Sequence, residues 1–155
     1  MNLIIGLGNP GQDYQNHRHN VGQYFVDRLN QPPAGWIFLK SNHFMNQSGI
    51  YVKKMVDYYQ ANLSDLYLVH DDLDLRVGEW RLHFGRGGAG HHGVESVIRL
   101  LGSQNFWRCR IGIDHPGDST PVEDYVLRPF TATEQKVIDQ TIDKIISRIT
   151  TILGR

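Results

Sequence analysis

An asparagine and a histidine that could carry out acid–base chemistry lie close together near the start of the chain. The apolar segment Leu3–Ile5 runs into the turn G-L-G-N-P-G, which places Asn9 at the end of a predicted strand. His19 follows directly before an apolar-periodic segment that is expected to be helical. In open α/β sheets, chemistry gathers at strand ends. A neutral imidazole near an amide at such a place can act as a general base beside a polarising group.

Polar side chains also follow other apolar segments and would converge with this pair in one cleft. They are Asn46, His70, Asp71, His91 and His92. A carboxylate fixes the tautomer of a neighbouring imidazole and stabilises its protonated form, so Asp71 is a suitable partner for His19. Aspartate is also a common turn and cap residue, so spacing alone leaves both roles open for Asp71.

Gly6, Gly8 and Gly11 satisfy the G-x-G-x-x-G pattern of dinucleotide-binding proteins. That use requires a helix that begins at the third glycine and holds a pyrophosphate at its N-terminus. The residues after Gly11 lack apolar periodicity, and Asp27, the acid at a suitable spacing for ribose, falls inside a predicted helix. A tight turn is therefore the better interpretation, and we predict no cofactor.

A metal site is a competing interpretation, because the chain has eight histidines and the acidic run H-D-D-L-D at 70–74. Specific ligand spacings such as H-E-x-x-H do not occur in the sequence. Cys109 is the one cysteine, which excludes an internal disulfide and a thiolate cluster. We therefore predict no metal ligands.

Strand and helix patterns alternate along the chain, and these elements must position the polar residues. Beyond the first strand, the expected strands are 36–39, 66–69, 77–84 and 108–113, and the expected helices are 21–29, 50–60, 94–101, 122–127 and 133–153. Thr133 is the expected N-cap of the last helix. The alternation predicts an α/β fold, a single three-layer domain over residues 1–155, with a mixed, mostly parallel twisted sheet flanked by helices.

The bulk composition excludes several classes of protein. The chain is 40% hydrophobic and 21% charged, with zero formal net charge. Its apolar runs are too short to span a membrane, and its start lacks the charge and cleavage site of a signal peptide. We expect a cytoplasmic protein, a monomer that has no membrane partner.

Basic residues gather in one segment although the chain is neutral overall. Between 76 and 110 there are six arginines against two glutamates, namely Arg76, Arg81, Arg86, Arg99, Arg108 and Arg110. Arg81 and His83 share one side of the alternating strand 77–84, which predicts a half-exposed strand with a basic outer face. A solvated surface of mixed charge explains the arginine count more simply, so charge alone does not establish a nucleic-acid partner.

Short motifs that occur in a fixed order over nearly the whole chain carry a family resemblance. They are G-L-G-N-P-G with Tyr14, R-H-N-V-G, F-M-N-Q-S-G, V-H-D-D-L-D-L, G-G-A-G-H-H-G and R-I-G-I-D-H-P-G. Together they are highly specific, and in them the chain resembles the bacterial peptidyl-tRNA hydrolase family. The resemblance implies a peptidyl-tRNA partner and an enzyme that hydrolyses the ester between a peptide and the terminal ribose of tRNA.

The resemblance also implies roles for individual residues. His19 matches the catalytic base, Asp71 the aspartate that orients it, and Asn9 and Asn46 the asparagines that bind substrate and help position the attacking water. The expected substrate-binding residues are Tyr14, Asn20, Phe44, Met45, His91, His92, Arg81 and Arg110. The residue chemistry agrees, because ester hydrolysis needs an activated water and donors for the developing oxyanion. A nucleophilic serine or cysteine motif is missing, which fits direct attack by water.

The chain differs from the family's usual sequence in three places. Gly88 and Ala89 replace a histidine and a glycine, and His92 replaces an asparagine that contacts substrate. The span between His19 and Asn46 is much shorter than usual, and K-S-N-H-F-M-N replaces K-P-x-T-Y-M-N. Two functions follow: a divergent, internally shortened hydrolase, or an RNA-binding relative without hydrolysis. The retained base with its orienting acid favours the enzyme, because a binding protein needs neither.

Overall fold

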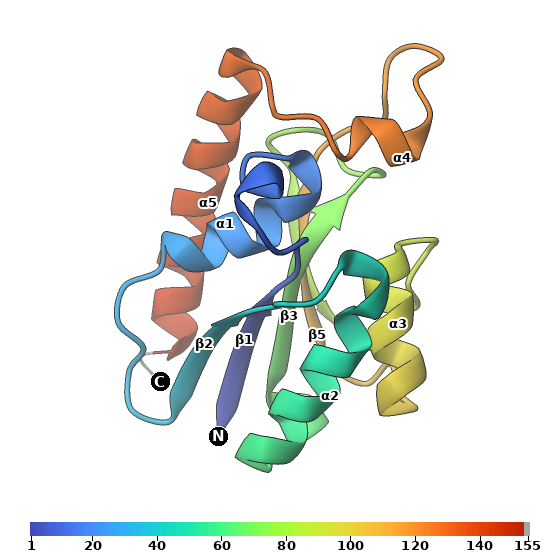
Figure 1. Ribbon diagram of the computed structural model, residues 1–155. Coiled ribbons are helices and arrows are strands. Elements are labelled where there is room, and N and C mark those ends of the chain that lie inside the picture. Colours follow the sequence, from blue (N-terminus) through green and yellow to red (C-terminus); the bar gives the residue numbers. More distant parts are fainter. Residues whose placement is uncertain (154–155) are drawn as a thin grey trace.

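A five-stranded sheet in the order β2-β1-β3-β5-β4 forms the middle layer of the computed structural model, which describes residues 1–153 (Figure 1). The strands are β1 (Asn2–Gly6), β2 (Trp36–Lys40), β3 (Leu66–Asp72), β4 (Trp80–Phe84) and β5 (Trp107–Gly112). β1 runs parallel to β2 and β3, β3 runs parallel to β5, and the edge strand β4 is antiparallel to β5. The predicted mixed, mostly parallel sheet is confirmed.

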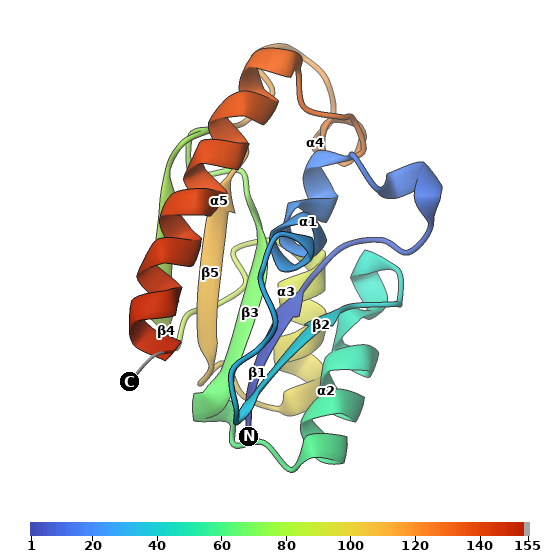
Figure 2. The same cartoon turned by 90° about the vertical axis from the view of Figure 1, so that its left-hand side faces the viewer.

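Helices cover both faces of the sheet (Figures 1 and 2). The longer ones are α1 (Val21–Asp27), α2 (Ser48–Tyr59), α3 (His92–Leu101) and α5 (Ala132–Leu153), with a short α4 (Val122–Tyr125). The 3-10 turns are η1 (Gln12–Tyr14), η2 (Arg18–Asn20), η3 (Met45–Gln47) and η4 (Leu63–Asp65). α1 and α5 pack on one face, and α2 and α3 pack on the other. The helices within 1–153 are too short or too polar to cross a membrane.

Alternation along the strands divides the apolar residues into two cores. Ile4, Val69 and Ile111 face α1 and α5, whereas Leu3 and Leu68 face α2 and α3. All five side chains are at most 1% exposed. Central parallel strands covered on both faces read as continuous apolar runs, which is why the segment 66–69 was recognisable as a strand.

Two glycines bring α1 directly onto the sheet. A Cβ atom on Gly22 would collide with the carbonyl oxygen of Val69, and one on Gly6 would collide with the carbonyl oxygen of Gly22. A side chain at either position would push α1 away from β1 and β3. The glycines therefore hold His19, just before α1, close to the carboxyl end of β3.

The segment that carries His19 is also held by the chain before α5. The backbone N–H groups of Arg18 and His19 donate to the carbonyl oxygens of Arg128 and Val126 at 3.0 and 2.9 Å. The buried guanidinium of Arg18 donates to the carboxylate of Glu134 at 2.8 Å. The backbone around His19 is thus held by the segment 126–128 and, through the Arg18 side chain, by α5.

The predicted N-cap of α5 was wrong. Thr131, not Thr133, caps the helix, because its Oγ1 accepts from the Glu134 N–H at 3.1 Å while the Glu134 carboxylate accepts from the Thr131 N–H at 2.9 Å. This reciprocal pair is a capping box. 

Other boundaries differ more modestly from the predictions. β3 extends through His70 and Asp71, so these residues belong to the strand itself. After Gly11 the chain forms only the short turn η1 rather than a helix, which supports the tight-turn interpretation of G-x-G-x-x-G.

Candidate active site

A cavity of about 730 Å³ opens where β1 and β3 end. Ten of the twelve predicted site residues line it: Asn9, Tyr14, His19, Phe44, Met45, Asn46, Asp71, His91, His92 and Arg110. The other two, Asn20 and Arg81, do not line it. The cavity walls come from strand ends, the glycine-rich loop and the region of α4, so segments distant in sequence meet here.

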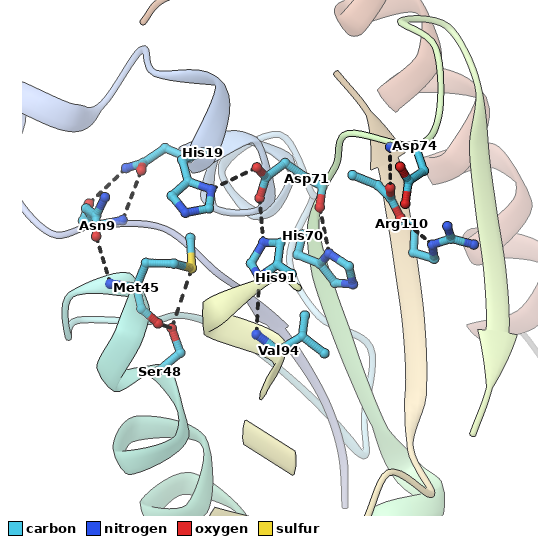
Figure 3. Close-up of polar contacts among 12 residues, drawn as sticks. Asn9, His19, Met45, Ser48, His70, Asp71, Asp74, His91, Val94 and Arg110 are labelled. Carbon is cyan, nitrogen blue, oxygen red and sulfur yellow. Dashed lines mark hydrogen bonds and ion pairs between the residues drawn. The ribbon is translucent and has the colours of Figure 1, made fainter. Parts of the chain in front are cut away.

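The carboxylate of Asp71 joins two histidines on the cavity wall (Figure 3). His19 Nδ1 lies 2.8 Å from Asp71 Oδ2, and His91 Nε2 lies 2.8 Å from Asp71 Oδ1. The Asp71 side chain is 2% exposed. With the Nδ1 proton of His19 donated to Asp71, the Nε2 atom of His19 is left as a proton acceptor.

Electrostatics around this pair favour a basic imidazole. Burial opposes the protonation of His19, but the adjacent Asp71 carboxylate outweighs burial and raises the pKa of His19 above 6.5. Burial likewise favours a neutral Asp71, yet His19 and His91 hold the pKa of Asp71 well below its usual value. Asp71 is therefore a carboxylate that can stabilise the charge His19 acquires when it takes a proton.

Asn9 is oriented by its neighbours (Figure 3). Its Oδ1 accepts from the Met45 N–H at 2.7 Å, and its backbone N–H and carbonyl exchange hydrogen bonds with the Asn20 side chain at 2.9 and 2.8 Å. Because Oδ1 is used, the Nδ2 group of Asn9 is left to donate to a ligand. Asn20 is 2% exposed and holds the Asn9 backbone, so its position does not support the expected substrate contact.

The side chains of Asn46, Tyr14 and Phe44 give the cavity wall polar and apolar surface that a ligand could contact. The exposed amide of Asn46 makes no hydrogen bond with any of residues 1–153. Phe44 is 51% exposed, and Tyr14 packs edge-on against it with ring centroids 6.0 Å apart. His92 is exposed at the start of α3 and also lines the cavity. A ligand could meet all four side chains.

The other end of the cavity is cationic, but it differs from the predicted basic outer face. Arg110 is 7% exposed, and its Nε lies 2.5 Å from Asp72 Oδ2. Arg81 is exposed; its guanidinium donates to the Trp80 carbonyl at 2.8 Å and lies 3.6 Å from Glu79. The predicted substrate contact of Arg81 is therefore not supported by its position. Edge-strand alternation indicates which side a residue faces, not whether a loop covers it.

Two further groups affect the charge here: Arg108 lines the cavity, and His83 lies beside Arg110 without lining it. Burial, together with Arg108 and Arg110, lowers the pKa of His83 to about 4, so His83 is neutral at pH 7. Arg108 is 3% exposed and lines the cavity, and its Nη2 donates to the Gly87 carbonyl at 2.7 Å. Burial and the neighbouring Arg110 lower the pKa of Arg108 to about 10, which leaves it charged at pH 7.

Sequence reasoning did not assign Arg108, Asp72 or the apolar wall of Val122, Val126 and Leu127 to the site, although all line the cavity. Alternation in β5 was a usable signal for Arg108, because it shares a strand face with Arg110. The apolar wall had no local signal, since its approach to His19 depends on pairing between distant segments.

Within residues 1–153, His19, Asp71 and His91 are also placed so that they could hold a metal ion, since one ligand atom from each lies within 4.8 Å of the others. Hydrogen bonds of 2.8 Å already engage both histidines with the carboxylate. The grouping is therefore explained by proton-mediated contacts, and general acid–base chemistry is the reaction it fits best.

Known proteins that are 33–41% identical to this chain share one description. The family profile for peptidyl-tRNA hydrolase matches residues 3–35 and 30–155. A peptidyl-tRNA hydrolase of Thiobacillus denitrificans is 39% identical over 162 residues, covering 93% of this chain and 80% of that protein. One from Bacillus cytotoxicus is 41% identical over 164 residues, covering 93% and 88%. The crystal structure of peptidyl-tRNA hydrolase from Acinetobacter baumannii has a TM-score of 0.88 at 33% identity, covering 99% of this chain and 89% of that one.

Proposed function

The chain belongs to the peptidyl-tRNA hydrolase family, and we propose that it hydrolyses the ester between peptide and tRNA with a water molecule activated by His19. The observation that carries this proposal is the 2.8 Å hydrogen bond between His19 Nδ1 and buried Asp71, which leaves Nε2 of a cavity-lining histidine as a base. The same hydrogen bond supports the orienting role of Asp71, one of the two roles that the sequence alone left open.

The reaction follows from these positions. His19 Nε2 takes a proton from water as the water oxygen attacks the ester carbonyl carbon, and Asp71 stabilises the resulting imidazolium. The amide groups of Asn9 and Asn46 supply neutral donors for the oxyanion or the substrate. Collapse of the tetrahedral intermediate breaks the bond to the ribose oxygen, which receives the proton from His19. The products are the carboxylic acid of the peptide, which loses its proton to solvent, and tRNA with a free hydroxyl.

The cationic end of the cavity suits the tRNA part of the substrate. Arg108 and Arg110 line it, and guanidinium groups bind phosphate oxygens by charge-assisted, often bidentate, hydrogen bonds. The aromatic pair Tyr14 and Phe44 offers apolar contact at the opposite rim. A substrate that spans the cavity would place its ester between these regions, near His19.

The proposal is tested by peptide release from a short N-acetylated peptidyl-tRNA. We expect the wild-type protein to release peptide and His19→Ala to lower the rate about 100- to 10,000-fold, the usual contribution of a general base. Circular dichroism and tRNA binding by the variant serve as controls for folding. Wild-type protein that binds tRNA but releases no peptide would instead be the RNA-binding relative, and a fully active His19→Ala would refute the assigned base.

A further inference from the structure

His91 is engaged at both of its ring nitrogens (Figure 3). Its Nδ1 accepts the N–H of Val94 at 3.2 Å, and its Nε2 lies 2.8 Å from Asp71 Oδ1. Since His91 is the N-cap residue of α3, the first of these contacts is a helix cap. The His91 side chain thus connects the start of α3 to the carboxylate beside His19.

The cap determines which nitrogen of His91 carries the proton. A backbone N–H can only donate, so Nδ1 must present its lone pair to Val94. The proton of the neutral ring is therefore on Nε2, where it is donated to Asp71. The cap thus fixes the tautomer of His91, and Asp71 receives one N–H on each carboxylate oxygen.

We propose that His91 is a positioning residue that acts through Asp71: it orients the carboxylate and withdraws part of its charge from His19, so that the start of α3 sets the basicity of the catalytic base. This inference rests on the proposed hydrolysis and gives His91 a different role from the expected substrate contact. His91 does line the cavity, but both ring nitrogens already have protein partners.

Other charged and titratable groups line the same cavity and must be considered in any pH effect. They are His70, Asp72, Arg108 and Arg110 from the strands, Tyr14 from η1, His92 from α3, Glu123 from α4, and Asp74, Arg86 and His115 from the loops. His70 Nδ1 donates to the Asp71 carbonyl at 2.8 Å, and burial, with His91 and Arg108, keeps the pKa of His70 well below 6.5. His70 therefore remains neutral across the range in which His19 titrates.

Two substitutions separate the cap from the contact with Asp71. Asparagine is a preferred N-cap residue, so His91→Asn keeps an acceptor for Val94 but is too short to reach Asp71. Glutamine is a poor cap with a longer side chain, so His91→Gln keeps a donor for Asp71 at the expense of the cap. If His91 acts only as a helix cap, His91→Gln should lose more activity than His91→Asn. If His91 positions Asp71, His91→Asn should lose more activity than His91→Gln.

The direct readout is the pKa of His19, measured by NMR titration of its ring in the substrate-free protein. Without the His91 donor, the Asp71 charge acts more strongly on His19, so we expect His91→Asn to raise the His19 pKa and to shift the acid limb of kcat/KM to higher pH. We expect kcat to fall by up to about 100-fold, because a loosened Asp71 misplaces the base. His91→Gln should recover part of both effects. Thr131→Ala, which removes the cap of α5, is the matched control and should leave the His19 pKa unchanged.

An unchanged His19 pKa and pH profile in His91→Asn would overturn the proposal, as would an equal or larger defect in His91→Gln. A higher KM with the pH profile unmoved would show a substrate contact instead, which also contradicts it. The NMR titration needs no substrate, so a raised His19 pKa in a protein that releases no peptide would support the coupling and refute only the proposed hydrolysis.

Discussion

The two ends of the cavity are organised in different ways. At the histidine end, formed by Asn9, His19, Asn46, Asp71 and His91, hydrogen bonds within the protein fix His19 and His91 on the carboxylate of Asp71, and the Met45 N–H holds Asn9. At the arginine end, formed by Asp72, Arg108 and Arg110, the carboxylate of Asp72 accepts from Arg110, and the guanidinium groups of Arg108 and Arg110 are buried. Nε and Nη1 of Arg108 are buried and find no hydrogen-bond partner in the described chain.

The histidine end is therefore already ordered for catalysis, whereas the arginine end has donors available to bind a ligand. A base must be held in one orientation before the substrate arrives, which internal hydrogen bonds achieve at the histidine end. A buried cation with unused donors is costly until an anion meets it. The lowered pKa of Arg108, which burial and Arg110 cause, is a sign of that cost. The arginine end is therefore suited to a phosphate, and the histidine end to the ester.

After His19→Ala, the largest effect is expected at Asp71. Asp71→Asn replaces a carboxylate that accepts from two imidazoles with an amide that presents one acceptor oxygen, so we expect kcat to fall about 100-fold or more. Asp71 raises the pKa of His19, so its neutralisation should move the acid limb of the pH–rate profile to lower pH. The pH dependence of kcat/KM checks this. An acid limb that stays in place or moves upward would mean that Asp71 does not support the charge on His19.

A loss of tRNA affinity, rather than of catalytic rate, is expected from substitution of Arg110. Arg110→Ala should weaken tRNA binding about tenfold and reduce the slope of log affinity against log salt by about one, because one phosphate contact is lost. Arg81→Ala is the matched control, since Arg81 lies opposite Arg110 in the β4–β5 pair but outside the cavity. A salt titration of tRNA binding measures both. Equal slopes for wild type and Arg110→Ala would remove the arginine end from substrate binding.

A gain of activity is expected at His92, which lines the cavity next to His91 at a position where the family resemblance implies an asparagine. An imidazole is bulkier than the family's asparagine amide and carries a charge when protonated, so it should hinder placement of the peptide end or the water. We expect His92→Asn to raise the hydrolysis rate several-fold on the same peptidyl-tRNA. An equal or lower rate would direct attention to the shortened segment between His19 and Asn46.

The smallest effect is expected at His83. Its pKa of about 4 keeps it neutral at pH 7, so it releases no counterion when tRNA binds. His83→Gln should therefore change tRNA affinity by less than about twofold between pH 6 and pH 8. A loss of affinity that grows toward pH 6 would show that His83 binds as a cation, as the predicted basic outer face implied.

The sequence predicted the histidine end better than the arginine end for a physical reason. Strand ends of a parallel sheet meet at one edge, so motifs after β1 and in β3 indicated that Asn9 and His19 would lie near Asp71. Alternation places Arg110 and Arg81 on a strand face, but only packing of the glycine-rich loop and Asp72 decides which of them is buried.

The sequence patterns did not predict contacts between individual side chains. Asn20 follows His19 in the same motif, and nothing local shows that its side chain turns back to the Asn9 backbone. Histidine is not a usual N-cap residue, so the link from His91 to Asp71 was not visible either. The T-x-x-E spacing of residues 131–134 was a usable signal for Thr131 as the N-cap of α5, but the prediction of Thr133 overlooked it.

Single-turnover hydrolysis with excess protein tests most directly whether the histidine end carries out the chemistry and the arginine end binds the substrate. Under saturating protein, weak binding no longer limits the rate, so we expect Arg110→Ala to approach the wild-type rate while His19→Ala remains about 100- to 10,000-fold slower. The opposite pattern, with His19→Ala restored by saturation and Arg110→Ala still slow, would contradict the assignment of chemistry to the histidine end and of substrate binding to the arginine end.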